Sequence, residues 1–233
     1  MNNPAVRQKL HENLDAVESR IARACARAGR KRSEVTLVAV TKKVSAELAA
    51  LLPELGVFDL GENRPQELWR KSAELPTTIR WHLIGHLQRN KIDRTLPIAK
   101  VIHAVDSIRL LQALEQEGAQ QQCSVVVLLE VNASGEASKE GFEPTELHTL
   151  VPIVSELKHV QVRGLMTMAA LQEPEACRPT FATLRRLRDQ LQGQIGSSHR
   201  LEHLSMGMSN DFEIAIEEGA TFIRLGTVLF EGL

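Results

Sequence analysis

The chain contains no tyrosine, and aromatic residues of all kinds make up only 3% of its 233 positions. Its three cysteines, Cys25, Cys123 and Cys177, are far apart and include no Cys-x-x-Cys pair, so neither a disulfide framework nor a thiolate metal site is predicted. No apolar run approaches a membrane span, and the polar N-terminus lacks the apolar core of a signal peptide. We therefore expect a cytoplasmic protein with no membrane partner.

An excess of charge of one sign is missing as well. The chain has 28 basic and 29 acidic residues and a formal net charge of -1, which gives no indication of nucleic acid as a partner. Hydrophobic residues reach 43%, enough for a substantial core, and no linker or low-complexity tract divides the chain. We expect residues 1–233 to form a single domain.

Short apolar runs alternate with helical patterns along the chain. An amphipathic helix is predicted over residues 3–28, followed by Gly29. Strands are predicted over residues 35–41, 57–60, 80–84, 100–105, 124–131, 160–165, 201–205 and 222–225. This alternation favours an α/β fold, a single (β/α)8 TIM-type barrel with an extra N-terminal helix, and an open doubly wound sheet is the alternative. Because little chain follows the last strand, we expect the N-terminal helix to take the place of a final barrel helix.

Capping signals mark two of the helices between the predicted strands. Ser107 opens a helix over residues 108–117, and Gly118 is expected to end it. Pro144 opens a second helix over residues 145–157. The repeating unit is therefore a strand followed by a helix.

Two lysines follow the first predicted strand, at the barrel end where ligands bind. The strand ends in Thr41-Lys42-Lys43. Neighbouring side chains of a strand point to opposite faces, so only one lysine is expected in the barrel mouth, and alternation alone does not say which. A solvated basic turn is the plain alternative. A desolvated lysine loses proton affinity and becomes a nucleophile toward aldehydes, which is the start of Schiff-base chemistry.

Glycine and hydroxyl residues follow the last two strands. The seventh is followed by Ser205-Met-Gly-Met-Ser209 and then by a helix-start pattern, and the eighth by Gly226-Thr227. In barrels of this kind the loops after strands seven and eight frequently hold a phosphate. Gly207 and Gly226 allow close backbone approach, while Ser205 and Thr227 add hydroxyl donors. With a strand-end lysine, these turns favour a phosphorylated aldehyde as the ligand.

Motifs spread over nearly the whole chain resemble those of one family. They are Leu37-Val-Ala-Val-Thr-Lys42, Gly61-Glu-Asn-Arg64, Trp81-His-Leu-Ile-Gly-His-Leu-Gln88, Ser138-Lys139 before Gly141, Arg163-Gly-Leu-Met166, Leu204-Ser-Met-Gly-Met-Ser209 and Arg224-Leu-Gly-Thr227. Through them the chain resembles the YggS/PROSC-type pyridoxal phosphate homeostasis proteins, whose barrel is similar to the N-terminal domain of alanine racemase. The resemblance implies pyridoxal 5′-phosphate as the cofactor.

The resemblance also implies roles for individual residues. Lys42 matches the family lysine that forms a Schiff base with the cofactor, which selects it over Lys43. Arg224 matches the arginine that faces the pyridine nitrogen. The phosphate cradle is matched by Ser205, Gly207, Gly226 and Thr227. The remaining expected cofactor-binding residues are Asn63 and His82 at the cofactor rim and Met166 at a strand end on the same face. No catalytic residue and no metal ligand is expected.

Two features favour binding over catalysis. Arg224 keeps its proton and would leave the pyridine nitrogen unprotonated, which makes the ring a poorer electron sink. The racemase that the chain resembles also needs a tyrosine base from a second domain, and this chain has no tyrosine. We therefore expect a monomer that buffers or delivers pyridoxal 5′-phosphate and maintains vitamin B6 and amino-acid/keto-acid homeostasis. Pyridoxal phosphate-dependent acceptor enzymes are its candidate partners.

Other interpretations remain open. A low-activity amino-acid racemase or related enzyme would use Lys42 and His82 as acid and base. A cofactor-free Schiff-base lyase or phosphosugar-binding barrel, and a partner-binding signalling module, are further alternatives. His82 and His86 are four residues apart, but Gly85 and the strand pattern argue against a helical zinc pair. Lys139, in the loop after the fifth strand, is a candidate second docking amine.

Overall fold

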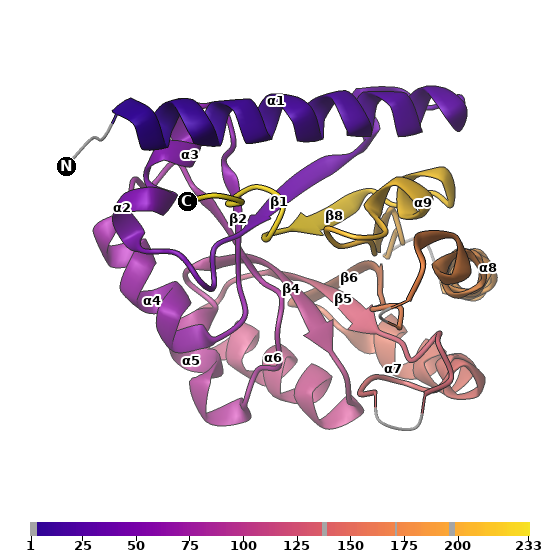
Figure 1. The fold of residues 1–233 in the computed structure, drawn as a ribbon. Coiled ribbons are helices and arrows are strands. Elements are labelled where there is room, and N and C mark those ends of the chain that lie inside the picture. Colours follow the sequence, from indigo (N-terminus) through magenta and orange to yellow (C-terminus); the bar gives the residue numbers. More distant parts are fainter. Residues whose placement is uncertain (1–3, 137–138, 171, 196–198) are drawn as a thin grey trace.

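Eight parallel strands close into a barrel in the computed structural model, which describes residues 4–136, 139–170, 172–195 and 199–233 (Figure 1). The strands are β1 Thr36–Val40, β2 Asp59–Glu62, β3 Arg80–Leu83, β4 Ala99–Val105, β5 Val125–Glu130, β6 Val160–Met166, β7 His203–Ser205 and β8 Phe222–Leu225. Each strand pairs with the next, and β8 pairs with β1 so that Val38 lies opposite Arg224. The predicted (β/α)8 barrel is confirmed and the open sheet is excluded.

Helices surround the barrel (Figure 1). The α-helices are α1 Pro4–Arg27, α2 Ala46–Ala49, α3 Leu51–Glu54, α4 Pro65–Glu74, α5 Ile92–Thr95, α6 Ile108–Gln121, α7 Leu150–Glu156, α8 Arg178–Gln192 and α9 Phe212–Glu217. Short 3-10 helices are η1 Arg32–Glu34, η2 Arg89–Lys91, η3 Pro144–Thr149 and η4 Pro174–Cys177. Within the described part of the chain, none of the helices combines the length and apolar character that crossing a bilayer requires.

Buried apolar side chains form two clusters, and β1 contributes to both. Leu37 and Ala39 belong to the larger cluster, which fills the space between strands and helices. Val38 belongs to the smaller cluster inside the barrel, whose other buried members are Val101, Ala104, Leu128, Met166 and Phe222. Side chains alternate along a barrel strand, so the even-numbered residues of β1 point inward.

The N-terminal helix covers the side of the barrel where the last strand meets the first. α1 lies alongside α9 (Figure 1), and Arg20 Nε donates to Glu213 Oε1 over 2.7 Å. Asn13 Nδ2 donates to the carbonyl oxygen of Leu229, just after β8, over 3.0 Å. As expected, α1 therefore takes the place of a last barrel helix.

The second strand begins and ends two residues later than predicted. It was expected over residues 57–60 but runs over Asp59–Glu62. Its last side chain, Glu62, is fully buried because it forms an ion pair with Lys71. A partner on a later helix thus permits a carboxylate in a strand that local hydrophobicity alone would end earlier.

Two predicted helices differ in detail. Gly118 does not end its helix, because α6 continues to Gln121 and is followed by Gln122 at φ 52°. An added Cβ at Gly118 would lie 2.8 Å from His159 Cβ, so the glycine serves close packing rather than termination. The helix predicted over residues 145–157 divides into η3 and α7.

Candidate functional site

Lys42 lies in the turn that follows β1, at the carboxyl end of the barrel strands. The backbone N–H of Thr41 donates to Gly61 O over 3.0 Å, which extends the β1–β2 ladder by one residue. The Thr41 side chain points outward and donates to Glu62 Oε1 over 2.6 Å. Lys42 and Lys43 lie in the turn that follows, where the alternation of the strand no longer applies. Both lysines are exposed, and no hydrogen bond or ion pair to another described residue engages the Lys42 amine.

A buried ion pair lies behind the turn that carries Lys42. Lys71 Nζ lies 2.6 Å from Glu62 Oε1 and donates to the carbonyl oxygen of Thr41 over 2.7 Å. The side chains of Lys71 and Glu62 are 1% and 0% exposed. The same Thr41 carbonyl accepts from Val44 N over 3.0 Å, so this cluster fixes the first residue of the turn. The buried Lys71 amine therefore has a structural role and is not available to a ligand.

The loops after β7 and β8 touch one another. Gly207 has φ 93°, and its carbonyl oxygen accepts from Arg224 N over 3.0 Å. Val228 N donates to Ser209 Oγ over 3.4 Å, which joins the two turns. Thr227 is exposed and Ser209 half-buried beside it. Two glycine turns and two hydroxyl groups therefore meet at one point of the barrel mouth, where an anion could be held.

The β8 turn also lies against the end of β1. A Cβ added at Gly226 would lie 3.2 Å from Val40 O, two residues before Lys42. The expected capping arrangement after β7 takes a different form, because Asp211 Oδ1 accepts from Met208 N over 2.6 Å and does not cap α9. This bond closes the β7 turn on itself.

Arg224 is buried inside the barrel mouth. Its Nη1 donates to Ser205 Oγ, and its Nη2 donates to Thr167 O over 3.0 Å. Burial lowers the pKa of Arg224 to about 10, so the guanidinium keeps its charge at neutral pH. A guanidinium has five N–H donors, and three remain for a ligand.

Polar side chains continue from Arg224 into the barrel. The fully buried Ser205 Oγ lies 2.8 Å from His103 Nδ1, and His103 Nε2 lies 2.8 Å from His82 Nδ1. His82 Nε2 lies 3.0 Å from Asp59 Oδ1, at the start of β2. Burial lowers the pKa of His103 well below its ordinary value, and the positive charge of Arg224 acts in the same direction. This chain of side chains was not predicted from the sequence.

The remaining expected residues lie at different depths. Asn63 is exposed directly after β2, and Met166 ends β6 in the inner cluster at 1% exposure. His82 was expected at the rim, but it is 1% exposed inside the barrel, because both ring nitrogens find partners there. The hydroxyl of Ser205 likewise points to the interior. His82 and Ser205 can therefore contact a ligand only from the interior side of the barrel mouth.

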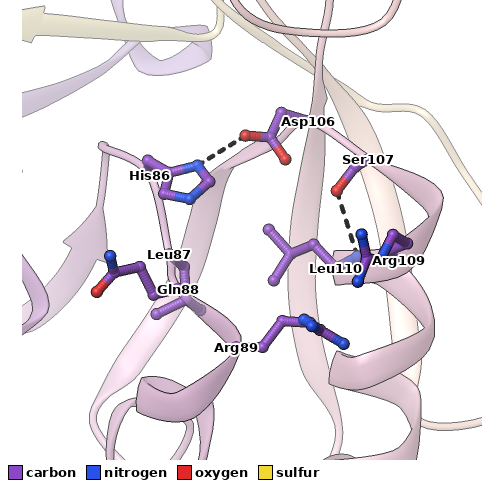
Figure 2. A pocket seen from close by; sticks show the side chains of 8 residues that line it. All are labelled: His86, Leu87, Gln88, Arg89, Asp106, Ser107, Arg109 and Leu110. Carbon is purple, nitrogen blue, oxygen red and sulfur yellow. Dashed lines mark hydrogen bonds and ion pairs between the residues drawn. The ribbon is translucent and has the colours of Figure 1, made fainter.

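An acidic and histidine-containing cluster lies beside the mouth. His86 Nδ1 lies 2.7 Å from Asp106 Oδ2 (Figure 2), and ligand atoms of His86, Asp106 and Glu140 all lie within 4.8 Å of one another. One imidazole and two carboxylates at this spacing could hold a divalent cation. The adjoining cavity, of about 290 Å³, is also lined by Arg89 and Arg109 (Figure 2).

A larger cavity, of about 350 Å³, is lined by residues at the ends of β5 and β6, including Glu130 and Thr167. Burial, and then the charge of Asp106, raises the pKa of Glu130 to about 7. Lys139 also lines this cavity, and its amine donates to Met168 O over 2.9 Å. Ser138, the residue before Lys139 in the same motif, lies outside the described residues.

Sequence reasoning assigned no role to several residues that build this region. Ser209 is the last residue of the motif Leu204-Ser-Met-Gly-Met-Ser209, and its hydroxyl next to a glycine turn was the available signal. Asp59, His103 and Lys71 lie within otherwise apolar patterns, where a polar residue indicates a buried partner but does not identify it.

The model of the alanine racemase N-terminal domain family matches residues 13–233. The chain belongs to this family. Within it, the pyridoxal phosphate homeostasis protein of Aquifex aeolicus (strain VF5) is 42% identical over 221 residues, which cover 94% of the chain and 96% of the relative. The protein of the same name from Pseudomonas aeruginosa is 41% identical over 224 residues, 94% of each chain.

Solved structures agree with this membership of the alanine racemase N-terminal domain family. PipY of Synechococcus elongatus PCC7942, with PLP bound, has a TM-score of 0.83 and 34% identity, over 95% of the chain and 99% of PipY. Alanine racemase of Clostridium difficile 630 has a TM-score of 0.74 at 16% identity, over 95% of the chain but only 55% of the racemase. The second likeness shows the fold alone.

Proposed function

We propose that the chain binds pyridoxal 5′-phosphate reversibly at Lys42 and buffers or delivers it in the cytoplasm. It would thereby maintain vitamin B6 and amino-acid/keto-acid homeostasis. The observation that carries the proposal is the exposed Lys42 in the turn after β1, whose amine makes no hydrogen bond or ion pair with the described residues, next to the joined β7 and β8 turns. Relatives named pyridoxal phosphate homeostasis proteins, whose matches cover 94% of the chain, support the proposal.

The residues present fit this cofactor. When bound, pyridoxal 5′-phosphate supplies an aldehyde that condenses with a lysine amine to a Schiff base. Lys42 offers the amine. The backbone at Gly207 and Gly226, with the hydroxyl groups of Ser209 and Thr227, offers donors for the phosphate.

The other expected residues complete this proposed site. Arg224 directs its unused N–H groups to the pyridine nitrogen, Asn63 offers an amide at the rim, and Met166 offers an apolar surface below. Ser205 and His82 act from the interior, where Ser205 Oγ accepts from Arg224 and its hydroxyl lies beside His103.

We infer a non-catalytic role from the same residues. A charged Arg224 next to the pyridine nitrogen cannot accept a proton, so it does not favour a protonated ring, and the chain contains no tyrosine to act as a racemase base. The alternative is a low-activity amino-acid racemase or related enzyme. Release of racemised amino acid at ordinary enzyme rates, abolished in Lys42→Ala, would favour that alternative.

We further propose that residues 1–233 act as one barrel domain and as a monomer, with pyridoxal phosphate-dependent enzymes as acceptors. Gel filtration with light scattering tests the monomer. Activation of an apo-enzyme by cofactor-loaded protein, faster than by the same concentration of free cofactor, tests delivery.

The binding proposal is tested by absorbance after addition of pyridoxal 5′-phosphate. The wild-type protein should gain a visible band that dialysis retains, and Lys42→Ala should lose it. Lys43→Ala is the matched control, because it removes the neighbouring exposed amine of the same turn, and it should keep the band. A wild-type protein that stays colourless, or a band that depends on Lys43, would contradict the proposal.

A further inference from the structure

The buried side chains inside the barrel form one unbroken hydrogen-bonded path. It runs from Asp59 through His82, His103 and Ser205 to Arg224, and each of these residues is at most 9% exposed. Phe222 packs against both histidine rings, with ring centroids 5.5 Å and 5.3 Å away. The path therefore connects the first residue of β2 with the arginine in the barrel mouth.

The two ends of this path fix the directions of the hydrogens. An ionised carboxylate only accepts hydrogen bonds, and a guanidinium only donates them. Asp59 must therefore accept from His82 Nε2, and Ser205 Oγ must accept from Arg224. Between these ends, one arrangement with two neutral histidines pairs every hydrogen, and one extra proton, carried by His82 or by His103, reverses the bond between His103 and Ser205. Burial holds the pKa of His103 well below its ordinary value, so the extra proton belongs on His82.

In the first arrangement both histidines are neutral and carry their hydrogens on Nε2. His103 donates to His82, and the Ser205 hydroxyl donates its only hydrogen to His103 Nδ1. In the second arrangement His82 carries one extra proton, so that it donates to both Asp59 and His103. His103 then donates to Ser205, and the hydroxyl hydrogen of Ser205 becomes free.

Burial decides between the arrangements in the free protein. Ser205 is 0% exposed, so a released hydroxyl hydrogen would have no solvent partner. A ligand with an acceptor oxygen in the mouth would supply that partner and favour the second arrangement. The bond from Arg224 to Ser205 is preserved in both, because the hydroxyl oxygen can accept twice.

We propose that Asp59 and His82 are positioning residues for the ligand, and that a phosphorylated cofactor accepting from Ser205 binds together with one proton that His82 takes from solvent. This inference rests on the proposed function, since it needs an acceptor oxygen in the barrel mouth. Because one proton is taken up on binding, the affinity for the ligand should fall about tenfold for each unit by which the pH rises. This holds over the pH range in which the free protein has the first arrangement.

Charged groups around the path favour an acceptor at Asp59 and a donor at Arg224. Arg80 Nε donates to Asp59 Oδ1 over 2.8 Å and keeps the carboxylate an acceptor. His203 packs on Phe222 from β7, and burial lowers its pKa, so it adds no charge at neutral pH. The charges of Glu130 and Asp211 raise the pKa of Arg224 and so favour its charged form.

The first test reads the tautomers without any ligand. Histidine ¹⁵N spectra of the free wild-type protein at pH 7.5 should show His82 and His103 as neutral rings protonated on Nε2. A neutral ring of either residue protonated on Nδ1, or a charged ring, would overturn the proposal whether or not the protein binds a cofactor.

The second test counts protons by calorimetry in buffers of different ionisation enthalpy. The probe is 4′-deoxypyridoxine 5′-phosphate, which keeps the phosphate and ring but lacks the aldehyde that Lys42 would engage. Wild-type protein should take up about one proton more than Asp59→Asn, because an asparagine amide can donate to His82 and let the path reverse without a proton. The control Arg80→Lys keeps the Asp59 acceptor and should match the wild type.

These outcomes separate the two proposals. Binding of the probe with equal proton counts in wild type and Asp59→Asn would overturn the coupling and leave the proposed function intact. Failure of the wild type to bind both the probe and pyridoxal 5′-phosphate would overturn the proposed function and the coupling with it.

Discussion

Lys71 and Glu62 form an ion pair in the interior of the protein, with 2.6 Å between Nζ and Oε1 and almost no exposed surface on either side chain. Lys71 also donates to the carbonyl oxygen of Thr41, the residue before Lys42. A helix residue outside the barrel therefore fixes the backbone that presents the proposed cofactor lysine.

Lys71→Met should destabilise the protein by about 3–5 kcal/mol, because it leaves Glu62 buried without a counter-charge. Urea unfolding at pH 7 measures the change. Arg70→Met is the control on the same helix, since Arg70 is half exposed and its surface ion pairs should contribute about 1 kcal/mol or less. The double variant Glu62→Leu/Lys71→Met should recover part of the loss. Equal effects of Lys71→Met and Arg70→Met would argue against a structural role for the buried pair.

Glu130→Gln should stabilise the protein at and above neutral pH. Burial, and then Asp106, raises the folded-state pKa of Glu130 to about 7, above the unfolded value of about 4.3. The wild type therefore loses stability as pH rises from about 4.3 through 7, and the difference from Glu130→Gln should approach 3 kcal/mol at pH 8. Unfolding free energies measured from pH 4.5 to 8 check this. Parallel curves for the two proteins would contradict it.

Ionised Asp59 should stabilise the folded protein, and this stabilisation should be lost in acid. Burial alone would raise its pKa, but hydrogen bonds from Arg80 and His82 outweigh burial and lower it to about 2. A depressed carboxyl pKa stabilises the fold above about pH 4, and this stability is lost as pH falls toward 2. Acid unfolding should show about 2–3 kcal/mol of pH-dependent stability that Asp59→Asn lacks. An identical acid dependence in the variant would count against this account.

Gly207→Ala should be more harmful than Gly29→Ala. Both glycines have positive φ, 93° and 64°, so alanine is strained at either by about 1 kcal/mol. At Gly207 the new Cβ would also lie 2.6 Å from Ala215 Cβ and 2.9 Å from Phe212 Cα, whereas nothing lies within 4 Å at Gly29. We expect an additional loss of about 1–3 kcal/mol at Gly207, together with weaker phosphate binding. Thermal unfolding and inorganic phosphate titration measure both, and equal melting temperatures would refute the packing argument.

Local patterns predicted those elements whose own residues decide their structure. The apolar residues 125–129 within the strand predicted over 124–131 became most of β5, and the spacing of apolar residues at positions 3–28 became α1. The pattern was less informative for β2, where Glu62 depends on a lysine nine residues later. Gly118 was misread because its neighbour His159 comes from a distant part of the chain.

The sequence by itself determined the eight-strand barrel, the two lysines at the end of the first strand and the glycine turns after the last two. These follow from hydrophobic periodicity and turn chemistry, which act over a few residues. Only the tertiary structure decided that the turn at Gly226 lies against the end of the strand before Lys42 and that His82 lies beneath the rim. The path through His103 and Ser205 joins residues 102 positions apart, and such a contact exists only once the sheet has closed.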